Sequence, residues 1–431
     1  MRKIPFAVLI TVAHLLTIPG AIADSRAYEN AEDLSAADIL PRDLLKGQYH
    51  TVDDRVRNDG YLNYYTIKSD FGAFDADSTA TLKIRIGEIK ALAELDELSQ
   101  TKIFVKAAAD AGVGQLKSIK QFATNPIDTV VGIPRGIGRM FKRYLRQSGE
   151  AVDATKEFVD ADDVEQTDGE KEDDSNAAVD MTESFFSVSG AERAWAQKLG
   201  TDPYTTNGTL RAAIKEVAWA ESLGRFAIGF ADIPKIPGAD IVDDVTQAVW
   251  SKDPYELQDL NRARLVATGA DEELIEKYLE NQRFSPTQQT ALTAAVAELA
   301  DVEGRAGILL EALNAETDAE IRFFVRSVTM LAWYHLNHSL IVSVITDAAI
   351  PAATTVDGKL VIMFAADHIY WTEGVAQTAG IYHSALSANA ATDARELWFL
   401  GTASERSDHE LTALGWEVHY ELAQTIAEES E

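Results

Sequence analysis

The residues best suited to chemistry lie in the final quarter of the chain. His335 and His338 are about one helical turn apart, and Asp367, His368 and Glu373 follow some thirty residues later. Imidazole nitrogens and carboxylate oxygens together can hold a divalent metal ion. The spacing matches no zinc signature such as HExxH. We therefore expect the two histidines to end a core helix, where imidazoles can meet the terminal carbonyl groups.

Two βα-like segments offer further candidate sites. Asp367 and Glu373 follow a strand-like run and could form an acid–base pair, because open α/β sheets bind ligands beyond the carboxyl ends of their strands. The segment FLGTASERSDHEL, residues 399–411, predicts a turn and a helix start that could bind an anion. We favour a structural role for both segments, with Thr372 and Ser404 as helix N-caps. The sequence contains no GxSxG nucleophile motif.

A different chemistry is indicated by PIDTVVGIPRGIGRMFKRYLRQ, residues 126–147. Its apolar and basic residues recur at helical spacing, which predicts a basic amphipathic helix. Such a helix can bind an anionic membrane, with its cations at the phosphates and its apolar side chains in the interface. The predicted contact residues are Arg135, Arg139, Lys142, Arg143, Arg146, Phe141 and Tyr144. The alternative is a domain's last helix, with its apolar stripe packed on the preceding sheet.

Charge changes sign directly after this segment. Residues 102–147 carry nine basic and two acidic side chains, whereas residues 150–183 carry fourteen acidic and two basic ones. The acidic stretch has almost nothing to bury, so we predict a disordered linker over residues 149–184. We hypothesise that this linker competes with a membrane or a partner for the basic helix. The formal net charge of the whole chain is −30, which excludes nucleic acid as an expected partner.

The first residues predict export from the cytoplasm. Arg2 and Lys3 precede an apolar run, and Ala21-Ile22-Ala23 forms a small-residue cleavage site. This layout is typical of a secretory signal peptide over residues 1–23. The chain has no cysteine, so it has no disulfide, thiolate metal site or lipid-attachment cysteine. No motif in the sequence indicates a cofactor, and we expect none. We expect an exported bacterial protein that resides in the periplasm, where it could associate peripherally with a membrane.

Hydrophobic periodicity divides the remainder into three parts. Residues 34–148 predict an antiparallel β-meander with helices, including one capped by Ser78 that runs to about Leu98. Residues 185–338 predict a helical region, with helices over 256–268, 271–282, 285–299, 306–313 and 317–338. Residues 339–425 predict a small β-α-β-α-β unit. The expected fold class is therefore α+β, mainly helical, with a C-terminal helical array closed by a small α/β unit.

Two segments of the N-terminal third carry a resemblance to a protein family. VRNDGYLNYY, residues 56–65, and NPIDTVVGIPRGIGRMFKR, residues 125–143, together with the signal peptide, resemble a family of uncharacterised exported bacterial proteins. The resemblance implies export and a bacterial source. It implies no activity, cofactor or site residue.

The sequence thus favours a periplasmic binding or scaffold protein without catalytic activity. It would contact an anionic membrane surface or a protein partner through the basic amphipathic helix. The alternative is a periplasmic enzyme, such as a metal-assisted hydrolase, with its site in the C-terminal α/β unit.

Overall fold

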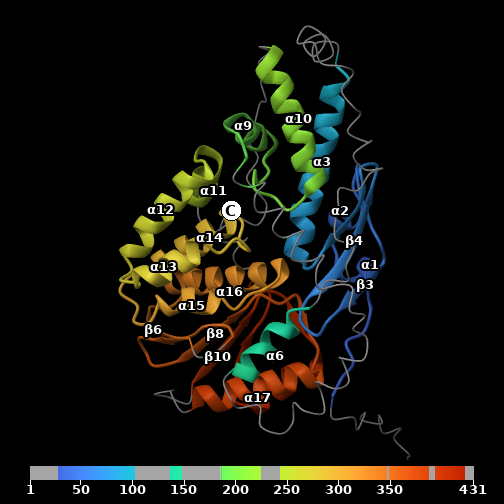
Figure 1. The fold of residues 1–431 in the computed structure, drawn as a ribbon. Helices are drawn as coiled ribbons and strands as arrows, with labels where there is room; N and C mark the ends of the chain where they lie inside the picture. Colours follow the sequence, from blue (N-terminus) through green and yellow to red (C-terminus); the bar gives the residue numbers. More distant parts are fainter. Residues whose placement is uncertain are drawn as a thin grey trace, which may run out of the picture.

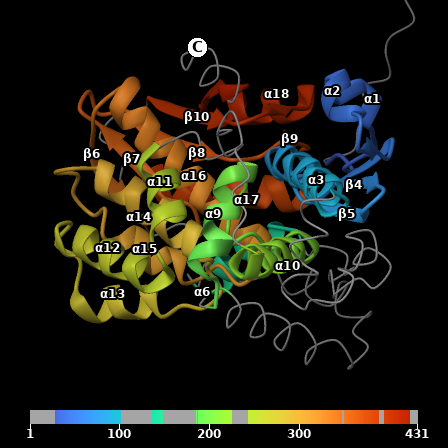
Figure 2. The same ribbon diagram turned by 90° about the horizontal axis from the view of Figure 1, so that it is seen from above.

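The computed structural model describes residues 28–101, 136–147, 185, 187–224, 243–346, 349–387 and 394–422. Helices predominate over strands, and the predicted mixed α+β, mainly helical class is confirmed. Figures 1 and 2 show an N-terminal sheet beside a long helix pair, a group of shorter helices, and a C-terminal sheet.

The N-terminal sheet is antiparallel, as predicted. Its strand order is β1-β3-β4-β2, and β5 pairs with β4. The register sets Arg57 opposite Tyr64 and Ile67 opposite Phe74. The strands are β1 (Leu34–Ser35), β2 (Thr51–Val52), β3 (Arg55–Asn58), β4 (Asn63–Ser69) and β5 (Gly72–Ala76), and two short helices, α1 (Ala36–Ile39) and α2 (Arg42–Leu45), lie between β1 and β2.

The long helix that follows this sheet begins at a serine cap. Ser78 is extended, and its Oγ accepts a hydrogen bond from the backbone N–H of Thr81, so α3 (Thr79–Ser99) begins where predicted. Its apolar face packs against α10 (Gly208–Gly224) and the N-terminal sheet in one buried cluster. Figure 2 shows α3 and α10 side by side.

The shorter helices form the middle of the molecule. Capping boxes begin α9, α12, α14 and α16, which explains why the sequence locates their starts well. Neighbouring helices pack through α12, α14 and α16 in turn. The helices are α9 (Gly190–Leu199), α11 (Asp243–Ser251), α12 (Pro254–Val266), α13 (Glu272–Leu279), α14 (Pro286–Glu298), α15 (Gly307–Ala312) and α16 (Asp318–Asn337).

The C-terminal sheet has the order β12-β10-β8-β7-β6. Strands β8, β10 and β12 are parallel and are joined by helices, which gives the predicted β-α-β-α-β unit, while β6 and β7 extend it antiparallel. The strands are β6 (Ile341–Ile345), β7 (Ala352–Thr355), β8 (Leu360–Phe364), β10 (Arg395–Phe399) and β12 (Glu417–His419), and the connecting helices are α17 (Glu373–Ser387) and α18 (Glu405–Ala413). A separate parallel pair consists of β9 (His368–Ile369) and β11 (Thr402–Ala403).

Helices cover both faces of this sheet. In Figure 1, α16 lies above the strands, and α6 (Gly138–Gln147) and α17 lie below them. Phe141 of α6 stacks on Tyr61 at a centroid distance of 5.3 Å and on Phe364 at 5.6 Å, and Phe323 of α16 meets both phenylalanines edge-on. One buried cluster therefore contains residues of the N-terminal sheet, α6 and the C-terminal sheet.

Polar contacts also connect the N-terminal sheet to the C-terminal part of the chain. The Asp367 carboxylate accepts hydrogen bonds from the backbone N–H groups of Asn63 and Thr79, each at 3.0 Å. Arg322 of α16 forms an ion pair with Asp77. Burial alone would raise the pKa of the Asp77 carboxyl, but Arg322 outweighs it and lowers the pKa to about 2. The charged form of Asp77 is therefore part of the folded structure.

Within the described residues, no helix has both the length and the apolar character needed to cross a membrane.

Glycine is required where α6 approaches the loop after β3. A Cβ atom at Gly136 would overlap the Asp59 carboxylate. That carboxylate cannot easily move, because it accepts hydrogen bonds from Tyr61 N (3.0 Å), Leu62 N (2.8 Å) and Tyr64 Oη (2.9 Å). This contact explains one of the glycines that interrupt the basic segment.

We predict that Gly136→Ala lowers the free energy of unfolding by about 1–3 kcal/mol, because an overpacked site must shift anchored groups. Urea denaturation followed by circular dichroism measures the change. Gly380→Ala is the matched control: no atom lies within 4 Å of the added methyl group in α17, so this variant should be unchanged or up to about 1 kcal/mol more stable. Equal stabilities for the two variants would contradict the packing argument.

Candidate functional site

The apolar side of the basic segment is buried in the described structure. Phe141 is 2% exposed and lies in the aromatic cluster between the two sheets, and Ile137 and Met140 are buried beside it. The prediction that Phe141 enters a membrane interface is therefore wrong. The apolar stripe instead packs inside the protein, as the alternative expected, against residues of the N-terminal sheet region and of the C-terminal sheet.

The basic residues of the segment differ in their surroundings. Arg143 is tied to α16: its guanidinium pairs with Glu320, which is 1% exposed, and lies 3.1 Å from Glu316. Arg139 is exposed to solvent. Arg135 and the side chains of the other predicted contact residues lie outside the described residues; these are Lys142, Tyr144 and Arg146. Contact between the cationic residues and an anionic surface stays a prediction.

The predicted metal residues do not come together as one site. His335 Nδ1 accepts a hydrogen bond from Ile341 N at 3.0 Å, so it closes the turn after α16. His338 packs against Tyr334 and Trp398. His335 and His338 thus end a core helix, as expected.

The other three candidates have separate structural roles. Asp367 accepts from the backbone N–H groups of Asn63 in β4 and Thr79 in α3, as described above. His368 Nδ1 lies 2.7 Å from Thr402 Oγ1, across the β9–β11 pair, and burial lowers the pKa of this imidazole. Glu373 is the first residue of α17. No metal-holding group in the described residues includes any of these five residues.

The carboxyl ends of β8 and β10 are covered by the N-terminal part of the chain. Asp367 N donates to Tyr61 O at 3.0 Å, and Tyr370 N donates to Gly60 O at 3.2 Å. Glu29 Oε2 accepts from Trp371 N and Ser404 Oγ, both at 2.6 Å. The predicted anion site at the start of α18 thus meets a carboxylate of the same chain.

One cluster in the described residues could place three metal-ligand atoms close together. Glu396, Glu417 and His419 have ligand atoms within 4.8 Å of one another. However, the Lys359 ammonium group already lies 2.6 Å from Glu396 Oε1, and Tyr334 Oη and Trp398 Nε1 donate to Glu396 Oε2, each at 3.0 Å. The Glu396 carboxylate is thus already paired with a lysine and accepts from two further donors, which argues against its use as a metal ligand.

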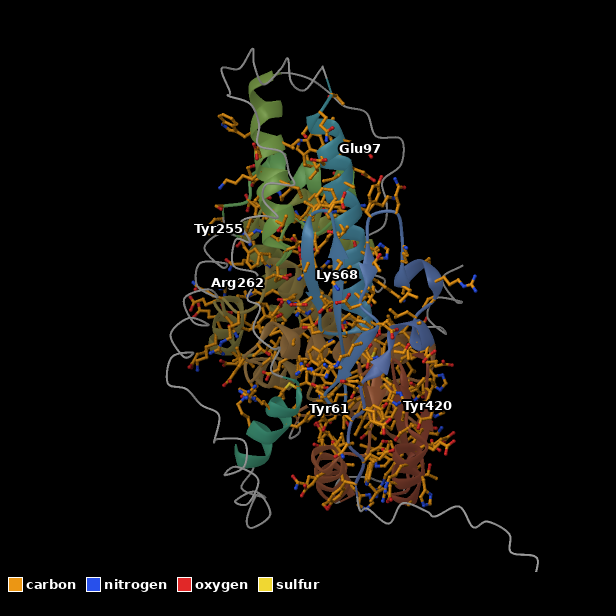
Figure 3. The ribbon with its side chains drawn as sticks, turned by 90° about the vertical axis from the view of Figure 1, so that its right-hand side faces the viewer. Tyr61, Lys68, Glu97, Tyr255, Arg262 and Tyr420 are labelled. Carbon is orange, nitrogen blue, oxygen red and sulfur yellow. The ribbon has the colours of Figure 1, made fainter. Side chains whose placement is uncertain are left out.

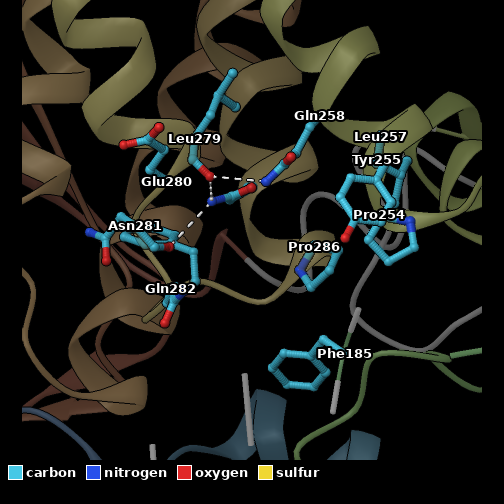
Figure 4. A pocket seen from close by; sticks show the side chains of 12 residues that line it. Phe185, Pro254, Tyr255, Leu257, Gln258, Leu279, Glu280, Asn281, Gln282 and Pro286 are labelled. Carbon is cyan, nitrogen blue, oxygen red and sulfur yellow. Dashed lines mark hydrogen bonds between the residues drawn. The ribbon is translucent and has the colours of Figure 1, made fainter. Parts of the chain in front are cut away.

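A groove in the helical region is one concave feature formed by described side chains (Figure 4). It has a volume of about 490 Å³, within the range of small-molecule sites. The start of α12, the end of α13 and the start of α14 form its walls. The lining residues are Phe185, Pro254, Tyr255, Leu257, Gln258, Leu279, Glu280, Asn281, Gln282, Phe284, Pro286 and Gln289.

The groove has an apolar base and a polar, accessible rim. Leu257, Leu279 and Phe284 are buried. Tyr255 is 65% exposed, the largest exposed fraction of any lining aromatic residue, and Glu280 is also exposed. In Figure 3, Tyr255 lies in the upper half of the molecule, away from Tyr61 in the core below. An apolar base with a few polar groups is the usual composition of a ligand site.

Two glutamine side chains in the groove are held in one orientation. Gln289 Nε2 donates to three backbone carbonyls at the end of α13, those of Tyr278 (3.3 Å), Leu279 (3.1 Å) and Asn281 (3.3 Å). Gln258 Nε2 donates to Leu279 O at 3.2 Å. These bonds, some of them drawn in Figure 4, fix each –NH₂ toward the carbonyls. Each amide oxygen is thereby turned away from them and left as an acceptor.

Sequence reasoning missed this groove, although it predicted helices at all three positions. The only local signal is a repeated pattern: Asp253-Pro254 and Ser285-Pro286 each begin a helix and are followed within four residues by a glutamine. Such patterns are common helix starts. Their meeting in one groove depends on the packing of α12 against α14, which no local pattern specifies.

Comparison with known proteins adds no assignment, since no family model, curated protein or solved structure matches this chain.

A partly buried aspartate connects to α14, one of the helices that form the groove. Asp202 Oδ1 accepts from Thr287 Oγ1 (2.7 Å) and from Tyr204 N (2.8 Å), which ties the loop before α10 to the first turn of α14. Burial raises the pKa of the Asp202 carboxyl to about 6. Between about pH 4 and pH 6 the Asp202 carboxyl therefore keeps its proton in the folded state and loses it in the unfolded state. Protonation of Asp202 thus stabilises the folded state at low pH, and this stabilisation is lost as the pH rises through about 6.

We predict that Asp202→Asn raises the free energy of unfolding at pH 7.5 by about 1–3 kcal/mol, because the amide keeps the Oδ1 acceptor and removes the buried charge. The gain should disappear near pH 4. Urea denaturation at both pH values measures it, with Asp259→Asn, on the exposed side of α12, as the control. A gain that does not depend on pH would contradict the assignment.

Proposed function

We propose that this protein is an exported, non-catalytic binding protein whose ligand enters the groove between α12, α13 and α14. Export follows from the signal peptide predicted over residues 1–23. The observation that carries the binding role is the groove itself: a volume of about 490 Å³ with a buried apolar base and two amides held in place by helix-end carbonyls.

The composition of the groove supports binding over catalysis. Its lining residues include one carboxylate, Glu280, and no serine, threonine, histidine or lysine. A hydroxyl or amine nucleophile needs a base within hydrogen-bond reach to activate it, and the lining residues supply no such pair. The groove can therefore hold a ligand in a defined orientation without a side chain that attacks it.

Contact with an anionic membrane is a second candidate function. It is favoured by the exposed position of Arg139 on α6. Because Phe141 belongs to the core, such contact would be electrostatic, with cations near the phosphates and without insertion of this ring. The ligand groove and the membrane contact use different elements, so each can be tested separately.

We predict that Tyr255→Ala weakens ligand binding in the groove without a change in stability, because Tyr255 is mostly exposed. The probe is 4-phenylbutanol, a neutral compound that carries a ring and a hydroxyl group, measured by saturation-transfer NMR and titration. We expect about a fivefold or larger loss of affinity when the aromatic wall is removed. Tyr28→Ala, at a partly exposed tyrosine of the N-terminal segment, is the control. Equal affinity of both variants and the unaltered protein would argue against the groove.

We predict that Arg139→Gln weakens binding to phosphatidylglycerol vesicles about fivefold, as expected for the loss of one interfacial cation. The mature chain is co-sedimented with the vesicles at low and high salt. Binding should be lost at about 0.5 M salt, because screening removes an electrostatic contact. Arg42→Gln, exposed on α2, should have no effect. Binding that survives high salt would instead indicate insertion of apolar side chains.

A further inference from the structure

We propose that the ligand of the groove is an organic cation, with an ammonium or guanidinium group on an apolar stem. This inference rests on the proposed binding function and specifies the chemistry of its ligand. It follows from the orientation of two glutamine amides and from the negative charge at the end of α13.

The glutamine amides supply acceptors to the groove. The –NH₂ groups of Gln258 and Gln289 are both used on backbone carbonyls of the α13 end, at 3.1–3.3 Å. What remains for a ligand is the oxygen of each amide. An acceptor selects a ligand that donates, and the strongest donors are the N–H groups of a cation.

The end of α13 adds negative potential. Residues 279–282 line the groove at the C-terminus of this helix, where the helix dipole presents its negative end. Glu280, the C-cap residue, adds a carboxylate at the rim. The dipole end and the carboxylate both favour a positive charge in the groove.

The starts of α12 and α14 also lie at the groove and would, if uncapped, favour an anion. Both are closed by capping boxes. Asp253 accepts from Tyr255 N and Glu256 N, and Glu256 accepts from Asp253 N. Ser285 and Gln288 make the corresponding pair in α14. In addition, Pro254 and Pro286 stand in the first turn and have no N–H. These helix starts therefore offer an anion few free donors.

The walls suit the apolar stem. Tyr255, Phe185 and Phe284 line the groove, and aromatic faces attract cations as well as alkyl chains. Phe185 has the Arg211 guanidinium 5.0 Å from its ring centroid, and Tyr255 is the most exposed of the three rings, at 65%. None of the lining residues is a lysine or an arginine, so no lining side chain would repel a cation.

The test uses three probes of matched size that differ in their head group: 4-phenylbutylamine, 4-phenylbutanol and 4-phenylbutanoate. Each is titrated into the mature chain by isothermal calorimetry at pH 7.5. We expect the amine to bind about tenfold more tightly than the alcohol, the scale of one hydrogen bond to a charged group, and the carboxylate to bind most weakly. Agmatine, a guanidinium with an alkyl stem, should compete with the amine.

Substitutions of lining residues test whether the preference for the amine arises in the groove. Glu280→Gln should weaken binding of the amine about threefold to tenfold and leave the alcohol unchanged, whereas Glu276→Gln, exposed one turn earlier in α13, should leave both unchanged. Tyr255→Ala should weaken all three probes. An alcohol or carboxylate that binds as tightly as the amine, through Tyr255, would overturn the cation assignment alone. Failure of all three probes to bind, or binding unaffected by Tyr255→Ala, would overturn the binding function itself.

Discussion

The packing of Phe141 between Tyr61 and Phe364 is the contact on which the rest of the structure depends. The three rings come from α6, the loop after β3, and β8, and their centroids lie 5.3–5.8 Å apart. Burial of one such side chain stabilises a fold by about 1.5–3 kcal/mol, and each aromatic pair adds about 0.5–1.5 kcal/mol. This is a large part of a typical total of about 5–15 kcal/mol. Exposure of Phe141 to a membrane would therefore require α6 to detach from Tyr61 and Phe364.

Helix α16 connects the aromatic cluster around Phe141 to the ligand groove. Helix α16 brings Phe323 to the aromatic cluster, Glu320 to Arg143 and Arg322 to Asp77. It also packs on α14, whose first turn forms a wall of the groove. The groove is therefore built on helices that are themselves held by the core between the sheets. A site on such supports keeps its geometry, which lowers the entropy that ligand binding must overcome.

Local signals in the sequence located the elements, and long-range packing decided their roles. Ser78, Ser189 and Thr317 cap helices as their side chains predict, and alternation of helices and strands gave the C-terminal unit. The burial of Phe141 was one of two alternatives that the sequence left open, because an amphipathic stripe looks the same whether it faces lipid or another part of the chain. The groove was missed for a related reason. Nothing in the local sequence distinguishes Gln258 and Gln289 from other helix residues, because their contacts with the α13 carbonyls depend on long-range packing.

The position of the groove has a physical explanation in what the helices and sheets leave unsatisfied. Ligands of open α/β sheets usually bind beyond the carboxyl ends of the strands. Here Gly60, Tyr61 and Glu29 occupy that edge with their own carbonyl and carboxylate groups. The last carbonyls of α13 are instead met by two glutamines, and a glutamine that donates its –NH₂ necessarily presents its oxygen elsewhere. The glutamines that bind the last carbonyls of α13 therefore also supply the amide oxygens that favour a cation in the groove.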